Sequence, residues 1–152
     1  MIIKQNLISP VMLWLIAVAG IFAIFQIFPN QLIFQKNAVV SFLVWFAIAF
    51  WLYLSISAAS VHRQSHLSVE RIDKVVETGI YAKVRHPMYL ADMILAWAAF
   101  LFQPEIRFLI SALWLTLVFF IWMNLEEKAL YEKFGEKYLK YKKRVPRIIP
   151  RF

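Results

Sequence analysis

Four long apolar stretches constrain this chain more than any other feature of its sequence. Their apolar parts cover about residues 7–28, 37–61, 88–102 and 108–125. A helix rises about 1.5 Å per residue, so about 20 apolar residues cross the roughly 30 Å of hydrocarbon in a bilayer. The sequence therefore predicts an all-α integral membrane protein with about four transmembrane helices.

The composition agrees with a membrane setting. Hydrophobic residues make up 62% of the chain and charged residues 17%, against roughly 45–50% and 25% in ordinary soluble domains. So few polar side chains cannot cover a soluble globule, whereas a lipid-facing surface removes that need. The chain has no cysteine, which excludes disulfides, zinc–thiolate sites and thiol nucleophiles.

The formal net charge of +8 is distributed unevenly along the chain. One Lys before the first stretch, five Lys or Arg in residues 62–87 and nine after Glu127 make 15 of the 17 basic residues. Four crossings would place all 15 on one side, and cytoplasmic loops are the ones enriched in Lys and Arg. We therefore expect a multi-pass protein with both termini in the cytoplasm. We expect no nucleic acid partner, because no basic and aromatic patch stands apart from the hydrophobic segments.

The second half of the chain predicts a helical hairpin followed by an amphipathic tail. Residues 88–102 would be about 22 Å long as a helix, and a turn at residues 103–105 joins them to residues 108–125. A tight transmembrane hairpin and a re-entrant pair both fit this length. Residues 126–143 repeat apolar side chains at three- and four-residue spacing, which predicts one cytoplasmic amphipathic helix. We expect the basic residues 142–144 to contact water or anionic lipid heads.

We expect a single membrane domain over residues 1–152. Residues 1–61 would supply two transmembrane helices, and residues 62–152 would form the core that binds a ligand. Polar and aromatic residues gather at the two ends of the hairpin, which its short turn brings to one membrane face. They are Gly79, Tyr81, Arg85, His86, Pro87 and Tyr89 before it and Glu126 and Glu127 after it. A pocket with these groups suits a zwitterionic, nucleotide-like ligand; an interfacial salt-bridge network with tyrosines of an aromatic belt is the alternative.

Two motifs at these positions resemble those of a known family. Residues 79–89, Gly-Ile-Tyr-Ala-Lys-Val-Arg-His-Pro-Met-Tyr, resemble the cofactor-binding motif of isoprenylcysteine carboxyl methyltransferases. The same family's C-terminal block resembles Glu126-Glu127, Leu130, Phe134-Gly135, Tyr138, Tyr141, Val145-Pro146 and Pro150. The chain is thus similar to the isoprenylcysteine carboxyl methyltransferase and phospholipid methyltransferase superfamily over about half its length. It looks like a small prokaryotic member, of a bacterial or archaeal cytoplasmic membrane.

The resemblance implies S-adenosylmethionine as the methyl donor and a lipid, or a prenylated small molecule or peptide, as the acceptor. It implies cofactor binding by Tyr81, Arg85, His86, Pro87, Tyr89, Glu126, Glu127 and Tyr138. Arg85 or His86 would hold the carboxylate or the adenine edge of the cofactor. Glu126 or Glu127 would accept hydrogen bonds from its ribose hydroxyls or its amino group. Tyr81, Tyr89 and Tyr138 would pack on adenine or face the sulfonium. Arg85, Glu127 and Asp92 are the residues expected to take part in catalysis.

Two positions depart from the family pattern. Ala91 stands where many members have glycine, and the methyl group of alanine is expected to narrow the space for close contact with the cofactor. Asp92 is an acid inside an expected crossing, where a lone carboxylate must face a partner or a cavity. It lies three residues from Tyr89, hence on roughly the same helix face. It either contacts the acceptor or bonds to a serine or tryptophan of the second or fourth crossing.

Other interpretations remain open at this point. Sterol-type membrane reductases that use a nicotinamide cofactor carry a similar Arg-His-Pro segment and a C-terminal block ending in proline. The adjacent Glu126-Glu127 pair and its spacing to Phe134-Gly135 favour the methyltransferase. A non-catalytic membrane subunit is a third class. His62 and His66 have metal-ligand spacing, but no carboxylate or cysteine completes a set, so we expect no metal.

Overall fold

The computed structural model describes residues 10–35, 38–61 and 72–149. These residues fold into helices, and the described ranges contain no strand beyond a single isolated bridge. The elements are α1 (Pro10–Ile27), α2 (Ala38–Val61), the 3₁₀ helix η3 (Gly79–Ala82), α3 (Pro87–Phe102), α4 (Ile106–Phe134) and α5 (Glu136–Arg144). The predicted all-α class is confirmed for this part of the chain.

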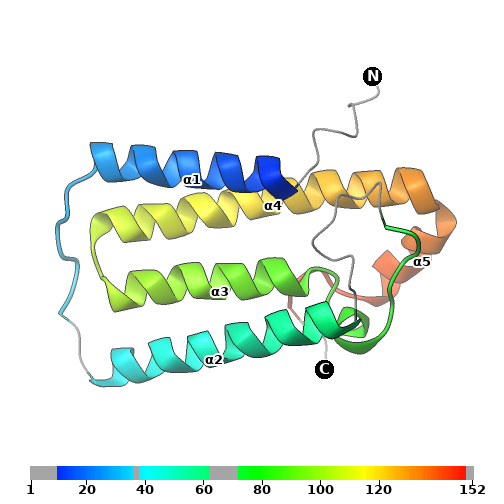
Figure 1. Ribbon diagram of the computed structural model, residues 1–152, viewed down its shortest axis with the longest axis horizontal. Helices are drawn as coiled ribbons and strands as arrows, with labels where there is room; N and C mark the ends of the chain where they lie inside the picture. Colours follow the sequence, from blue (N-terminus) through cyan, green and yellow to red (C-terminus); the bar gives the residue numbers. More distant parts are fainter. Residues whose placement is uncertain (1–9, 36–37, 62–71, 150–152) are drawn as a thin grey trace.

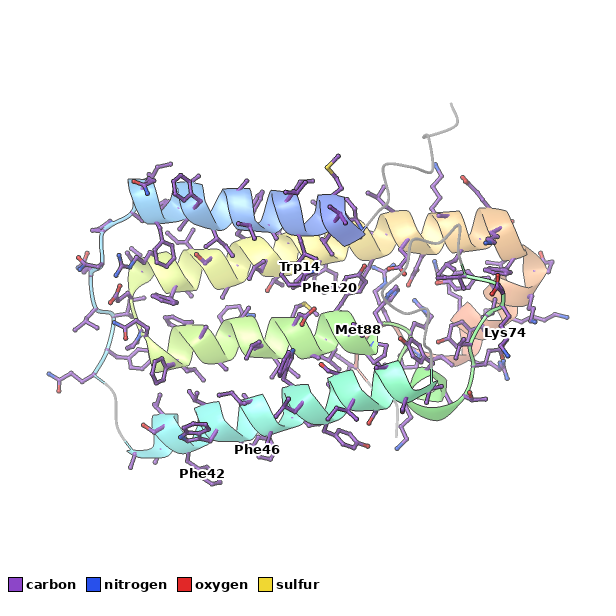
Figure 2. All side chains as sticks on the ribbon, in the orientation of Figure 1. Trp14, Phe42, Phe46, Lys74, Met88 and Phe120 are labelled. Atoms are coloured by element: carbon purple, nitrogen blue, oxygen red, sulfur yellow. The ribbon has the colours of Figure 1, made fainter. Side chains whose placement is uncertain are left out.

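The four long helices lie side by side in the order α1, α4, α3, α2 (Figure 1). The inner helices α3 and α4 have a neighbour on each side, whereas α1 packs on α4 and α2 packs on α3. The outer helices therefore keep large apolar side chains exposed, such as Phe42 and Phe46, which point away from α3 (Figure 2). A continuous apolar surface of this kind suits contact with lipid.

Two of these helices have the length and composition of membrane spans. They are α2, with 24 residues, and α4, with 29 residues. Helices α1 and α3 are apolar but shorter, and the 16 residues of α3 correspond to about 24 Å. The structure thus supports a membrane protein, and the expected total of four crossings stays a prediction.

The prediction of a single helix over residues 126–143 is wrong, because the tail of the chain contains a turn. Helix α4 continues without a break to Phe134, and the chain then turns at Gly135, whose φ is 54°. Glycine adopts positive φ at little cost, so it ends helices readily. Helix α5 starts at the next residue and folds back, so that Tyr138 and Tyr141 pack against Leu130 of α4.

Helices α1 and α4 approach closely at Gly20. A Cβ atom added there would collide with the indole of Trp114, and this indole donates a hydrogen bond to the Ala17 carbonyl oxygen over 3.3 Å. At the far end of the row, Ile33 donates its backbone N–H to the Pro104 carbonyl oxygen over 2.7 Å. Contacts at both places hold α1 against the α3–α4 hairpin.

Candidate active site

The first motif forms the entry to α3, at the end of the row where α4 extends towards α5 (Figure 1). Gly79 has a φ of 59°, and a Cβ atom there would lie 2.5 Å from Val61 Cγ2 of α2. Both facts require glycine at this position. Pro87 is in the first turn of α3, where a fixed φ and a missing N–H are tolerated. The tight turn and the proline together fix where Arg85 and His86 leave the backbone.

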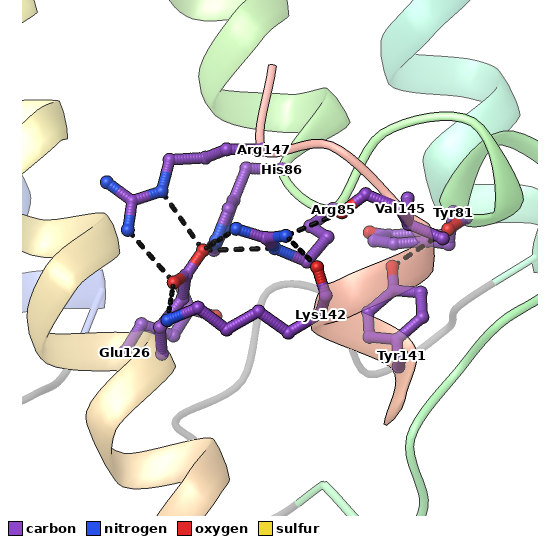
Figure 3. Close-up of polar contacts among 9 residues, drawn as sticks. Tyr81, Arg85, His86, Glu126, Tyr141, Lys142, Val145 and Arg147 are labelled. Atoms are coloured by element: carbon purple, nitrogen blue, oxygen red, sulfur yellow. Dashed lines mark hydrogen bonds and ion pairs between the residues drawn. The ribbon is translucent and has the colours of Figure 1, made fainter. Parts of the chain in front are cut away.

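Glu127 lies at the centre of a cluster of basic side chains, and only 2% of its side chain is exposed. Its Oε1 accepts from Arg85 Nη2 at 2.8 Å, from Arg147 Nε at 3.0 Å and from His86 Nε2 at 3.2 Å. Its Oε2 accepts from Lys142 Nζ at 2.8 Å and Arg147 Nη2 at 2.9 Å. Figure 3 shows these four side chains converging on one carboxylate. We call Glu127 and these four residues the Glu127 hub.

The surroundings of Glu127 act on its pKa in opposite directions. Burial on its own raises the pKa, because it disfavours the charged form. Hydrogen bonds from His86, Arg147, Lys142 and Arg85 favour the carboxylate, and together they hold the pKa well below its usual range. Glu127 is therefore ionised across the physiological pH range and supplies a fixed negative charge.

The hub binds the C-terminal segment to the first motif. Residues 141–147, which we call the strap, accept backbone hydrogen bonds from Arg85 N to Pro146 O (2.9 Å) and from His86 N to Arg147 O (3.1 Å). Arg85 Nη1 donates to the carbonyl oxygens of Lys142 and Val145 at 2.8 and 2.5 Å. The Tyr141 hydroxyl donates to the Tyr81 carbonyl oxygen over 2.8 Å (Figure 3). The strap and the first motif thus form one hydrogen-bonded unit.

A cavity of about 260 Å³ adjoins this unit. Its volume is slightly below the range for ligand pockets, roughly 300–1,000 Å³. Eight of the nine site residues predicted from the sequence line it: Tyr81, Arg85, His86, Pro87, Tyr89, Asp92, Glu126 and Tyr138. Glu127 is the ninth, and it is not among the described residues that line the cavity. The structure therefore brings the two motifs together around one space.

Two polar atoms in the cavity wall are buried without a hydrogen-bond partner in the described ranges. They are Glu126 Oε2 and the Tyr138 hydroxyl. His86 Nδ1 lies 3.8 Å from Glu126 Oε2, beyond hydrogen-bond distance. Burial raises the pKa of Tyr138 well above its ordinary value, so the hydroxyl keeps its proton and can donate. An unpaired buried polar atom costs about 1–3 kcal/mol, which a ligand with complementary groups would recover.

The structure shows one of the two roles considered for Asp92, and contact with the acceptor stays a prediction. Its Oδ1 accepts a hydrogen bond from Trp51 Nε1 of α2 over 3.1 Å, which is the expected helix-to-helix bond to a tryptophan. Its side chain also lines the cavity, three residues along α3 from Tyr89. The bond to Trp51 fixes the carboxylate at the cavity wall.

Several residues of the site were missed from the sequence. Leu13 and Trp14 of α1 line the cavity, as do Lys74 and other residues of the segment 72–76. The first motif begins at residue 79, so the resemblance gave no signal for them. Lys142 and Arg144 were expected to contact water or lipid heads; their side chains are exposed, and they also form ion pairs with Glu127 and Glu77. The available signal for these ion pairs was the excess of basic residues after Glu127, which need acidic partners.

The pair His62 and His66 lies outside the described residues. Within residues 10–35, 38–61 and 72–149, no group of three or more His, Asp or Glu side chains is placed to hold a metal ion. The absence of cysteine in the sequence removes thiolate ligands as well.

A row of apolar helices with a cavity and a buried ionic cluster at one end is the architecture of a membrane protein with a candidate small-molecule site. The family model described as phospholipid methyltransferase matches residues 37–137, which is more than half of the chain. The protein belongs to the phospholipid methyltransferase family. Helix α1 lies before the matched residues.

Two curated relatives are similar to part of the chain. Methanethiol S-methyltransferase of Pseudomonas deceptionensis is 42% identical over 73 residues, which cover 47% of this chain and 26% of the relative. Methanethiol S-methyltransferase 1 of Bradyrhizobium diazoefficiens is 38% identical over 71 residues, which cover 47% of this chain and 24% of the relative. The matched segment thus spans about a quarter of each relative's length. No solved structure matches the chain.

Proposed function

We propose that this protein is a membrane-embedded methyltransferase that uses S-adenosylmethionine. The observation that carries the proposal is the cavity, where both motifs meet and where Glu126 Oε2 and the Tyr138 hydroxyl are buried and unpaired. Membership of a family named for methyl transfer and the names of both relatives support the same activity. A sterol-type reductase has no such support from the comparisons.

The groups around the cavity match the parts of S-adenosylmethionine. Glu126 Oε2 is positioned to accept from the ribose hydroxyls or the amino group, and the Tyr138 hydroxyl is positioned to donate. Lys74 offers a cation for the carboxylate. The rings of Tyr81 and Tyr89 offer faces for adenine or for the sulfonium cation.

The bound cofactor supplies a methyl group on a positively charged sulfur, which leaves with the electron pair of the broken S–CH₃ bond. The protein needs to align an acceptor lone pair with that methyl group and to keep water away. Pro87 and the strap fix the wall that Arg85 and His86 occupy. An acceptor that carries a proton loses it to a neighbouring base, and His86 and Asp92 in the cavity wall are the candidates for this base.

We assign Glu127 a positioning role in this scheme. It does not line the cavity within the described part of the chain, and both of its oxygens are occupied by donors from the protein. It acts through Arg85 and His86, whose side chains it orients. This role differs from the direct cofactor contact that the sequence motif implied, and the two are separable by experiment.

We propose that the acceptor is a lipid or lipid-linked molecule that reaches the cavity from the membrane. Asp92, fixed by Trp51 at the cavity wall, would face the reacting head group and favour one that is cationic or carries an amine. A second candidate is a thiol, and the specific observation that favours it is the name of both relatives, methanethiol S-methyltransferase. Methyl transfer to a range of amines, carboxylates and thiols by the purified protein distinguishes these acceptor classes.

A pair of tyrosine variants tests the cofactor site. Tyr138→Phe removes a hydroxyl that has no described partner, whereas Tyr141→Phe removes one that bonds to the Tyr81 carbonyl oxygen. By calorimetry of the detergent-solubilised protein, we expect S-adenosylmethionine to bind and NADPH not to bind. We expect Tyr138→Phe to leave thermal stability unchanged or raised, and to weaken cofactor affinity by about two- to tenfold.

The control variant should behave in the opposite way. Tyr141→Phe should lower thermal stability, because it leaves the Tyr81 carbonyl oxygen without its donor. Binding of NADPH in preference to S-adenosylmethionine would refute the proposed activity. Unchanged cofactor affinity in Tyr138→Phe would refute the assignment of this cavity as its site.

A further inference from the structure

Helix α1 contributes to the cavity through Leu13 and Trp14. It lies outside the residues 37–137 that the family model covers. The two side chains differ in exposure: Leu13 is 3% exposed and belongs to the core around Phe119, whereas Trp14 is 47% exposed. Trp14 thus has one side on the cavity and another on the outer surface of the protein.

The outer surface around Trp14 is apolar. Val11, Leu15 and Val18 on the same helix are all largely exposed. An aliphatic and aromatic surface of this type is the one that a hydrocarbon environment favours. Whatever passes Trp14 into the cavity therefore comes from the lipid side of the molecule.

A line of aromatic rings leads inward from Trp14. Its ring meets Phe119 edge to face with 6.1 Å between centroids, Phe119 meets Tyr89 at 5.7 Å, and Tyr89 meets His86 at 5.5 Å. Figure 2 shows Lys74 near α5 and Trp14 farther along the helix row. Leu13 and Trp14 form the part of the cavity wall that we call the apolar end. The row of rings ends at His86, which lies beside Glu126 in the same wall. This arrangement fits an acceptor with an apolar chain and a polar reacting group.

We propose that Trp14 determines which acceptors enter, by limiting the width of the apolar end of the cavity. The inference rests on the proposed methyltransferase function, and it assigns to α1 the selection of acceptor size. The indole is a bulky wall, and its edge-to-face contact with the buried Phe119 resists displacement. A short or slender chain passes beside it, whereas a bulky chain requires the ring to move.

The test compares acceptors of one chemistry and different length in wild type and Trp14→Ala. Methanethiol, hexanethiol and dodecanethiol serve as the probes, with methyl transfer from S-adenosylmethionine as the readout. We expect Trp14→Ala to raise the ratio of kcat/KM for dodecanethiol over methanethiol by about tenfold or more, with unchanged cofactor affinity. The matched control is Trp45→Ala on α2, which removes an indole that is 71% exposed and is not among the described cavity residues.

An unchanged ratio, or the same change in Trp45→Ala, would overturn the proposal. An equal loss with all three thiols would overturn it too, because it would show that Trp14 supports the fold and not the selection. Monodisperse elution and an unaltered thermal midpoint establish that each variant is folded.

A second measurement does not depend on turnover. Because the chain has no cysteine, Trp14→Cys and Trp45→Cys each give a unique position for a nitroxide label. In lipid nanodiscs, dodecyl methyl sulfide should reduce the mobility of the label at position 14 and leave position 45 unchanged. Equal effects at both positions would reject the Trp14 entrance, even if no thiol were methylated. Absence of cofactor binding and of methyl transfer in wild type would instead reject the proposed function.

Discussion

Replacing Glu127 by glutamine should disconnect the strap from the first motif. The carboxylate of Glu127 accepts hydrogen bonds at both oxygens, and a carboxamide keeps one acceptor and gains an NH₂ group. In one orientation the NH₂ faces Lys142 Nζ and Arg147 Nη2. In the other it faces donors of Arg85, His86 and Arg147. Both orientations place donors against donors and leave the cations without a counter-charge.

The expected cost follows from the burial of each partner. Glu127 and Arg85 have side chains that are 2% and 8% exposed, so their separation falls in the class of broken buried ion pairs, about 3–5 kcal/mol. Lys142 is 43% exposed, so its ion pair with Glu127 adds little to this cost, because water screens the charge of Lys142. For a domain of this size about 1 kcal/mol changes Tm by roughly 2–4 °C. We therefore expect Tm to fall by roughly 6–20 °C.

Thermal unfolding of the cofactor-free protein in detergent measures this effect, and Glu132→Gln is the matched control. Glu132 is an exposed residue of the same helix, so its variant removes the same charge without touching the hub. Calorimetry then gives the affinity for S-adenosylmethionine. A positioning role predicts a lower Tm without cofactor together with weaker binding. An unchanged Tm with weaker binding would refute the positioning role and restore direct contact, and no change in either would refute both.

The pH dependence of the Glu127 hub, the role of Asp92 and the topology of the chain can each be tested. The pKa of Glu127 is depressed, so its stabilising contribution is complete above the ordinary value of 4.5 and is lost as pH falls towards the folded value. The difference in unfolding free energy between wild type and Glu127→Gln should shrink by about 1.4 kcal/mol per pH unit below that point, and a constant difference in pH-dependent denaturation would contradict it. Asp92→Asn retains the acceptor for Trp51, so we expect intact cofactor binding and reduced methyl transfer; full turnover with the native acceptor would make Asp92 structural. Reporter fusions should place both termini in the cytoplasm, and an external C-terminus would overturn the expected topology.

The secondary structure could largely be predicted from local patterns. Runs of apolar residues indicated the four long helices, and the Gln103-Pro104-Glu105 turn indicated the α3–α4 hairpin. The break at Gly135 was missed because the apolar spacing continues through it, and one glycine inside such a pattern costs only about 1 kcal/mol. The positive φ of Gly135 belongs to the turn that folds α5 back on α4, and local spacing along the chain does not record this packing.

The candidate site was predicted in part for a different reason. The hairpin brought residues 79–89 and the Glu126-Glu127 pair to one end of the molecule, and eight of the nine expected residues line the cavity. The separate roles of the two glutamates were not visible, because adjacent helix positions point in different directions, about 100° apart. Glu126 faces the cavity, and Glu127 faces the strap.

The sequence by itself determined that this chain is helical and apolar, that it belongs beside the membrane methyltransferases, and which two motifs build its site. Those properties depend on local spacing, hydropathy and residue identity, all of which can be read along the chain. Only the tertiary structure decided which side chains meet. Arg85 binds Glu127 from 42 positions away, and its guanidinium also reaches the Val145 carbonyl oxygen 60 positions away. Trp14 joins the cavity from a helix that neither motif includes. Such contacts depend on how helices pack, and no periodicity in the chain records distances between residues so far apart.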